Sequence, residues 1–146
     1  MQIIRATIDN LDILVPLFDG YRVFYNQKSN PEAARKFLNE RFQKEDSVIF
    51  LATASDGLGL GFTQLYPSFS SVSMQRTYIL NDLFVSSEAR KKGIGEALME
   101  RAKLFAKNEG SKGLTLETAI DNPAQKLYER LGWKKDTHVN HYTWEI

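Results

Sequence analysis

A short basic turn carries the most distinctive chemistry of this sequence. Its residues, Arg90-Lys91-Lys92-Gly93-Ile94-Gly95, lie between an expected strand and an expected amphipathic helix. A helix N-terminus presents free backbone N–H groups and the positive end of the helix dipole, and glycines let a backbone approach its ligand closely. The turn therefore predicts an anion site with a pyrophosphate as its natural occupant. A solvated strand-to-helix turn would have the same local features.

The spacing of the glycines distinguishes between phosphate-binding motifs. A P-loop needs four residues between its glycines and then Lys-Ser or Lys-Thr, which the turn lacks. A dinucleotide fingerprint needs Gly or Ala where Leu98 stands, although Glu117 lies roughly where a ribose-binding acid is expected. The pattern Arg90-x-x-Gly93-x-Gly95 instead resembles the acyl-CoA pyrophosphate signature of the GNAT superfamily of N-acetyltransferases.

A second segment, residues 122–133, resembles a later motif of the same superfamily, an Asn-x-x-Ala-x-x-x-Tyr-x-x-x-Gly-Phe type pattern with Trp133 in the aromatic place. Its residues alone predict a short helix. Asn122 suits the N-cap, proline follows at the first helical position, Gln125 completes a capping box, and Gly132 provides the left-handed stop. The two motifs, in this order and separation, identify the chain as similar to GNAT proteins.

The resemblance implies an α/β fold with a central mixed β-sheet and helices on both faces. Two parallel strands, here about residues 77–85 and 113–118, would splay apart to admit acetyl-CoA. The implied activity is acetyl transfer from acetyl-CoA to a primary amine, with CoA as product, on a small molecule, a polyamine or a protein lysine or N-terminus. The positions that the resemblance assigns to the cofactor are Leu83, Phe84, Val85, Arg90, Lys91, Lys92, Gly93, Ile94, Gly95, Glu96, Asn122, Lys126 and Tyr128.

Acetyl transfer needs an acid for the leaving thiolate and help in deprotonating the amine. The resemblance assigns the acid to Tyr128, whose pKa near ~10 would let it donate to a thiolate of pKa ~8.5 at neutral pH. Asp82 and Glu117, one on each splayed strand, are the candidate bases, and a chain of waters is an alternative. Alternation along the strand puts Asp82 on the opposite face from Leu83 and Val85. Either acid could instead serve only as a strand-end residue.

The acceptor pocket is the least defined part of the prediction. The family places it near the first two helices and the loop before the long strand, where Tyr21, Tyr25 and Tyr66 could bind a cationic amine through cation–π contacts. At least two of the aromatic residues of the first helix are expected to be core residues instead.

Composition fits a single enzyme domain over residues 1–146. The 19 basic and 18 acidic residues give a net charge of +1, unlike the strong positive excess of nucleic-acid binders. No apolar run reaches the ~20 residues of a membrane span, so a cytoplasmic protein is expected. The absence of cysteine excludes a thiol-based acyl-enzyme and favours direct attack in a ternary complex. No other metal-ligating residues accompany His138 and His141 in the sequence, so no metal is expected.

Three alternatives concern function and assembly. The same motifs would suit a non-catalytic acyl-CoA-binding or sensor module, which the presence of Tyr128 disfavours. A nucleotide-binding regulatory domain is disfavoured by Leu98. The family resemblance implies a homodimer, although no dimer interface can be recognised in the sequence.

Hydrophobic periodicity and turn residues predict the element order β-α-α-β-β-β-α-β-α-β. The expected elements are a strand over 2–7, a helix over 10–27 that Pro16 kinks or staggers, a helix capped by Asn30 with Phe37, Leu38 and Phe42 buried, strands over 47–54 and 58–66, a polar loop over 67–73, a strand over 74–85, a helix over 93–108, a strand over 113–118, the Tyr128 helix, and final strands over 133–135 and 139–146.

Overall fold

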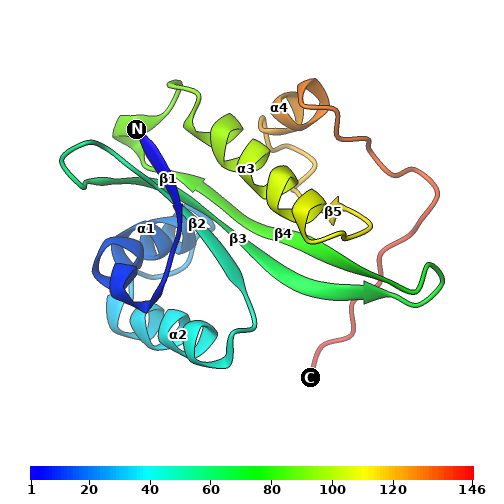
Figure 1. The fold of residues 1–146 in the computed structure, drawn as a ribbon, viewed down its shortest axis with the longest axis horizontal. Coiled ribbons are helices and arrows are strands. Elements are labelled where there is room, and N and C mark those ends of the chain that lie inside the picture. The colour runs from blue at the N-terminus through cyan, green and yellow to red at the C-terminus, as the bar shows by residue number, and fades with distance from the viewer.

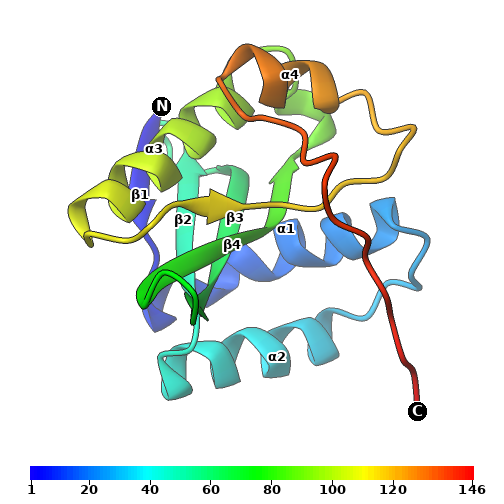
Figure 2. The same cartoon turned by 90° about the vertical axis from the view of Figure 1, so that its right-hand side faces the viewer.

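The computed structural model describes all residues 1–146, and its centre is one five-stranded mixed sheet with helices on both faces (Figure 1). Helices α1 and α2 cover one face, and α3 and α4 lie on the other (Figure 2). The elements are β1 (Gln2–Arg5), α1 (Leu11–Phe24), α2 (Pro31–Lys44), β2 (Val48–Thr53), β3 (Gly59–Ser70), β4 (Gln75–Val85), α3 (Ile94–Asn108), β5 (Leu114–Thr115) and α4 (Gln125–Arg130), with short 3-10 turns at Ile8–Asn10 and Ser87–Ala89. This is the fold class that the sequence predicts.

The sheet changes character at its last strand. The order is β1-β2-β3-β4-β5, and the first four strands pair antiparallel with their neighbours. β4 and β5 are parallel and pair only at Tyr78 with Leu114 and Ile79 with Thr115. Beyond Ile79, β4 and the segment that follows β5 diverge, so the edge of β4 that faces away from β3 has no strand partner there. The predicted splay between these strands is present.

Two apolar clusters hold the layers together. On the α3 side, Leu98, Met99 and Ala102 are fully buried against the sheet. On the other side, Leu14 and Leu38 are equally inaccessible beneath α1 and α2. β2 is buried along its whole length because both of its faces are covered by helices. The helices therefore fix the sheet from both sides.

A bulge in β4 decides which side chains face which layer. Gln64 pairs with Asp82, but the next residue, Leu65, pairs with Leu80, so Asn81 is an extra residue in β4. Before the bulge, Leu80 packs in the α3 cluster. After the bulge, Leu83 and Val85 pack against that cluster, while Phe84 packs against the α1 cluster. Asp82 thereby lies on the α1 face.

Helix ends follow the sequence in part. The Asn30 side chain caps α2 by accepting from the Ala33 N–H at 3.1 Å, with Pro31 at the first helical position, as the sequence predicts. α1 continues through Pro16 to Phe24. Leu38 is buried as expected, but Phe37 is 37% exposed, with one face of its ring stacked on that of Phe18 at 5.5 Å between ring centres.

The cap predicted for the Tyr128 helix is wrong. The Asn122 side chain accepts from the Ala124 N–H at 2.9 Å and closes a turn that precedes α4. The Gln125 side chain donates to the Ile120 carbonyl at 2.6 Å and does not complete a capping box. These local bonds compete with the first helical turn, so α4 begins two residues later than the sequence predicts.

Two predictions about strands are also wrong. β3 extends to Ser70, so the segment after Pro67 is a strand and not a loop. β2 pairs with β3 only as far as Leu65, so the outer part of β3 is an edge, where a proline costs no ladder bond. At the other end, the predicted strands over 133–135 and 139–146 do not form, because nothing in the chain pairs with them. None of the helices combines the length and apolarity that crossing a membrane requires.

Candidate functional site

The basic turn forms an open helix N-terminus. Gly93 precedes α3 in the left-handed conformation with a φ of 77°, and Lys91 also has a positive φ of 61°. No side chain caps the first turn of α3. The N–H groups at this end have no partner within the helix. A side chain built on Gly93 would meet nothing within 4 Å, so the surface over the turn is open.

The basic side chains of this turn differ in direction. The Arg90 Nε donates to the Val85 carbonyl at 3.1 Å, and its guanidinium lies 5.6 Å from the ring centre of Phe24. The Lys92 Nζ donates to the Glu88 carbonyl at 3.0 Å. Arg90 thus ties the turn to the end of β4 and to α1, while Lys91 forms no hydrogen bond or ion pair in the structure.

Other predicted cofactor residues lie around the same helix end. Glu96, in the first turn of α3, pairs with Arg130 of α4 at 3.0 Å. Lys126 is exposed on α4. Leu83 and Val85 pack toward α3, and the backbone between them is on the unpartnered side of β4. The turn, α4 and the free edge of β4 therefore surround the gap between the splayed strands.

Tyr128 lies half-buried on α4, with its ring 6.5 Å from that of Trp133. Burial raises the pKa of Tyr128, and the nearby Tyr25 phenol adds to the rise. The phenol is therefore protonated at neutral pH and able to donate a proton. Tyr25 in turn lies against Tyr21, with ring centres 5.0 Å apart. A row of phenols thus leads from α4 to α1.

Asp82 lies beneath this row and is only 3% exposed. Gln64 donates to one carboxylate oxygen at 2.6 Å, and the Asn81 side chain donates to the other at 3.0 Å. The same Gln64 amide donates to the Tyr66 hydroxyl at 3.1 Å. Burial, and next the charge of Asp82, raises the pKa of Tyr21 and that of Tyr66, the latter to about 12. The structure thus groups the buried acid Asp82 with two amides and two protonated phenols.

Comparison with known proteins identifies the family of this chain. Residues 14–133 match the model of the acetyltransferase (GNAT) family. The chain belongs to the GNAT family.

The relatives extend over nearly the whole length. The uncharacterized N-acetyltransferase YhfO of Bacillus subtilis (strain 168) is 48% identical over 97% of this chain and 95% of its own. A probable acetyltransferase of Haemophilus influenzae is 33% identical over 88% of this chain and 97% of its own. The crystal structure of a probable acetyltransferase, 44% identical, superposes with a TM-score of 0.95 over 100% of this chain and 98% of its own. The GNAT chain described here is thus an N-acetyltransferase, and members of the family use acetyl-CoA as acetyl donor for amine acceptors.

The two acids expected on the splayed strands have different environments in this GNAT protein. Asp82 is enclosed by the amides and phenols described above. The side chain of Glu117 is 78% exposed and lies 3.2 Å from the imidazole of His141. The structure therefore brings Asp82 together with Tyr21 and Tyr66, and leaves Glu117 on the surface.

Two amide side chains that hold Asp82, those of Gln64 and Asn81, are not among the residues that the sequence predicts for the site. Gln64 is fully buried in β3, two residues after the buried Phe62. An amide at an inward position of an otherwise apolar strand is the signal that could have indicated it. Asn81 gave no such signal, because its position depends on the bulge in β4.

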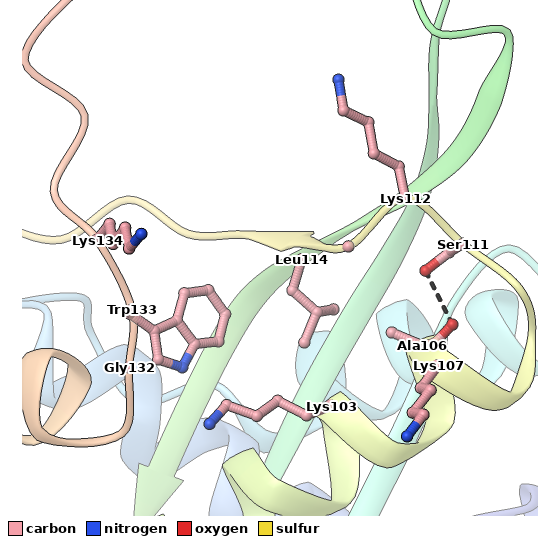
Figure 3. A pocket seen from close by; sticks show the side chains of 10 residues that line it. Lys103, Ala106, Lys107, Ser111, Lys112, Leu114, Gly132, Trp133 and Lys134 are labelled. Carbon is pink, nitrogen blue, oxygen red and sulfur yellow. Dashed lines mark hydrogen bonds between the residues drawn. The ribbon is translucent and has the colours of Figure 1, made fainter.

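A basic cavity lies apart from this site (Figure 3). It has a volume of about 480 Å³ and is enclosed by the C-terminal half of α3, β5 and the segment after α4. Four lysines line it together with Trp133: Lys103, Lys107, Lys112 and Lys134. None of the predicted site residues lines this cavity. No three His, Cys, Asp or Glu side chains gather where they could hold a metal ion.

Proposed function

We propose that this GNAT protein transfers an acetyl group from acetyl-CoA to a primary amine, by direct attack of the amine while both substrates are bound. The observation that carries the proposal is the divergence of β4 and β5 beyond Ile79, between an open helix N-terminus on one side and the buried Asp82 on the other. A thioester reaching through this gap would meet an amine bound on the α1 side.

The residues present fit acetyl-CoA. The free N–H groups at the start of α3, with Lys91 beside them, provide donors for a pyrophosphate. The unpartnered edge of β4 at residues 83–85 offers main-chain groups to the amide-containing pantetheine arm, in the manner of an added strand. One N–H of that edge would support the oxyanion, a contribution of roughly 2.7–4 kcal/mol in comparable sites.

Tyr128 is proposed as the acid. As the amine nitrogen bonds to the acetyl carbon and the carbon–sulfur bond breaks, the sulfur takes the phenolic proton. The raised pKa of Tyr128 keeps this proton in place at neutral pH. Arg90 has a positioning role, because its bond to the Val85 carbonyl fixes the turn relative to the strand edge.

Asp82 is proposed to attract the acceptor and to help remove its proton. An alkyl amine of pKa ~10.4 is neutral in only about one molecule in 2,500 at pH 7. Asp82 is better placed than Glu117 for this role, since it is buried among protonated phenols while Glu117 is exposed. Tyr21 and Tyr66 would orient the ammonium group over their rings and hydroxyls. The acceptor is therefore proposed to be a compact cationic amine or an exposed amine of a peptide.

The proposal is tested by measuring release of free CoA from acetyl-CoA with a thiol reagent across a panel of diamines, polyamines, lysine peptides, amino acids and aminoglycosides. The protein itself contributes no thiol background, because it lacks cysteine. Tyr128→Phe should lower kcat by roughly 100-fold or more for the acceptor that responds. Tyr142→Phe is the matched control, since Tyr142 is 86% exposed and should leave the rate unchanged.

The binding-module alternative predicts a different pattern. Acetyl-CoA would bind to the folded protein, but no amine would stimulate CoA release, and Tyr128→Phe would change neither observation. Equal rates for the Tyr128→Phe protein and the wild type with a good acceptor would contradict the assignment of the acid.

A further inference from the structure

The basic cavity beside β5 carries more positive charge than its surroundings balance. Four of its ten lining residues are lysines, and no aspartate or glutamate lines it. One of these lysines, Lys103, is paired with Glu100 at 2.7 Å, and the C-terminal end of α3 counts as about half a negative charge. The lysine charges therefore outnumber the negative charges around an open volume of about 480 Å³.

The end of α3 does not account for these lysines. Its carbonyls already have donors from the chain that follows, since the Ala106 carbonyl accepts from the Ser111 N–H at 3.1 Å and from the Ser111 hydroxyl at 3.0 Å. Lys112 and Lys134 lie outside α3, beside β5 and after α4 (Figure 3). The side chains of Lys107 and Lys134 are exposed and form no hydrogen bond or ion pair within the chain. Two ammonium groups are thus free to bind a ligand.

Another donor in the cavity wall lacks an acceptor. Trp133 lines the cavity, and its Nε1 is buried without a hydrogen-bond partner. The ammonium of Lys103 donates to the Leu131 carbonyl at 2.5 Å, so it lies near the indole (Figure 3), but an ammonium offers no acceptor. A buried donor without an acceptor is destabilising. An anion that places an oxygen beside Lys103 would satisfy the indole and the ammonium together.

We propose that this cavity is an anion site, and that its ligand is a small molecule carrying two or more phosphate groups. A lysine ammonium binds phosphate oxygens as a point charge, whereas the cavity has no arginine, whose planar fork matches a carboxylate. More than one phosphate is needed because the lysines come from three separate segments of the chain. The volume of about 480 Å³ falls within the roughly 300–1,000 Å³ of small-molecule sites.

The cavity is separate from the basic turn at Arg90–Gly95. α3 begins beside that turn and ends beside the cavity, and its 15 residues span roughly 22 Å. One pyrophosphate therefore cannot contact both ends of the helix. The cavity is instead joined to α4, because the Trp133 N–H donates to the Tyr128 carbonyl at 3.0 Å and the two rings lie 6.5 Å apart. A ligand that fixes Trp133 would also hold the end of α4 that carries Tyr128.

The first test is a titration of the Trp144→Phe protein with inorganic triphosphate and, separately, with ATP, both in the presence of EDTA. Trp144 is 84% exposed, so the variant should fold, and it leaves Trp133 as the only tryptophan. Both probes should change the Trp133 emission in a saturable way and release or absorb heat in a calorimeter, and added salt should weaken the binding.

Citrate is the comparison for a carboxylate ligand and should bind more weakly than either phosphate probe. Tighter binding of ATP than of triphosphate would support a nucleotide as the ligand, and the reverse order would support an inorganic phosphate chain. The absence of both heat and emission change with either phosphate probe would overturn the proposal. Citrate binding as tightly as triphosphate would overturn the assignment to phosphate.

The second test locates the bound anion by lysine variants in the same background. Lys107→Gln combined with Lys134→Gln should raise the dissociation constant for triphosphate by roughly 10-fold or more. Lys28→Gln combined with Lys36→Gln is the matched control, since it removes the same charge from exposed side chains in and before α2 and should leave the constant unchanged. Equal weakening by the two pairs, or weakening by Lys91→Gln in the basic turn instead, would overturn the proposal.

Discussion

Gly61 is the position where one added methyl group should disturb both the fold and the proposed cofactor edge. Gly61 pairs with Val85 across β3 and β4. A Cβ built there would lie 2.5 Å from the Phe84 carbonyl oxygen and 3.2 Å from the Val85 Cα. Both neighbours are backbone atoms of the strand whose other edge is proposed to bind pantetheine, so a rotamer change cannot relieve the overlap.

Relief requires β3 and β4 to separate locally, which for overpacked sites costs about 1–3 kcal/mol. For a domain of this size that corresponds to a fall in Tm of roughly 3–10 °C. Gly61→Ala should therefore unfold earlier in a calorimetric or circular dichroism melt. It should also raise the KM for acetyl-CoA, because Phe84 and Val85 move.

Gly95→Ala is the matched control, since its Cβ would have no contact closer than 3.8 Å. Alanine is also the better helix residue by up to about 1 kcal/mol. The Tm of Gly95→Ala should thus equal or exceed that of the wild type, while its KM for acetyl-CoA rises if the turn binds the pyrophosphate. A Gly61→Ala protein with the wild-type Tm would refute the steric reasoning.

Three further predictions concern a buried acid, the proposed catalytic acid and the core. The pKa of Asp19 is lowered by hydrogen bonds from the Ser29 hydroxyl at 2.6 Å and the Asn30 N–H at 2.7 Å. Its contribution to stability is therefore present above the ordinary pKa of 3.8 and is lost as the pH falls through the lower value in the folded protein. In urea melts at a series of pH values, the free energy of unfolding should fall less steeply toward acid pH for Asp19→Asn than for the wild type. Equal slopes for the two proteins would contradict this. The raised pKa of Tyr128 predicts that, at any pH below 10, kcat is not reduced by ionisation of this acid. A pH–rate profile with the best acceptor checks this. A fall in kcat near pH 8 that is absent from Tyr128→Phe would contradict it. Leu98 is a fully buried residue of α3, so Leu98→Ala should lower the free energy of unfolding by about 2–5 kcal/mol in denaturant titrations, and a smaller loss would mean that the cavity collapses.

The local sequence determined the turn at Arg90–Gly95 and the identity of the family. Gly93 has the positive φ that its place before a helix suggests, and Asn30 caps α2 as its residue type indicates. These features depend on interactions within a few residues, which a sequence displays directly. The order of elements as far as α4 follows from periodicity for the same reason.

Local patterns failed where a long-range partner decides the outcome. Residues 139–146 have the pattern of a strand, but a strand needs a neighbour, and the chain by itself supplies none. Pro67 predicts the end of β3, yet β3 continues because β2 has already ended beside it. The Asn122 side chain could cap either a helix or a turn, and its bond to Ala124 selects the turn.

The sequence by itself determined that a basic, glycine-containing turn before a helix, a tyrosine on a later helix and a strand acid are present in this N-acetyltransferase. Only the tertiary structure showed that the environments of Asp82 and Glu117 differ. The bulge at Asn81 turns Asp82 toward α1, where Gln64 meets it, while the divergence of β5 carries Glu117 out to solvent. Bulges and strand divergence arise from pairing between distant segments, so alternation along one strand does not reveal them.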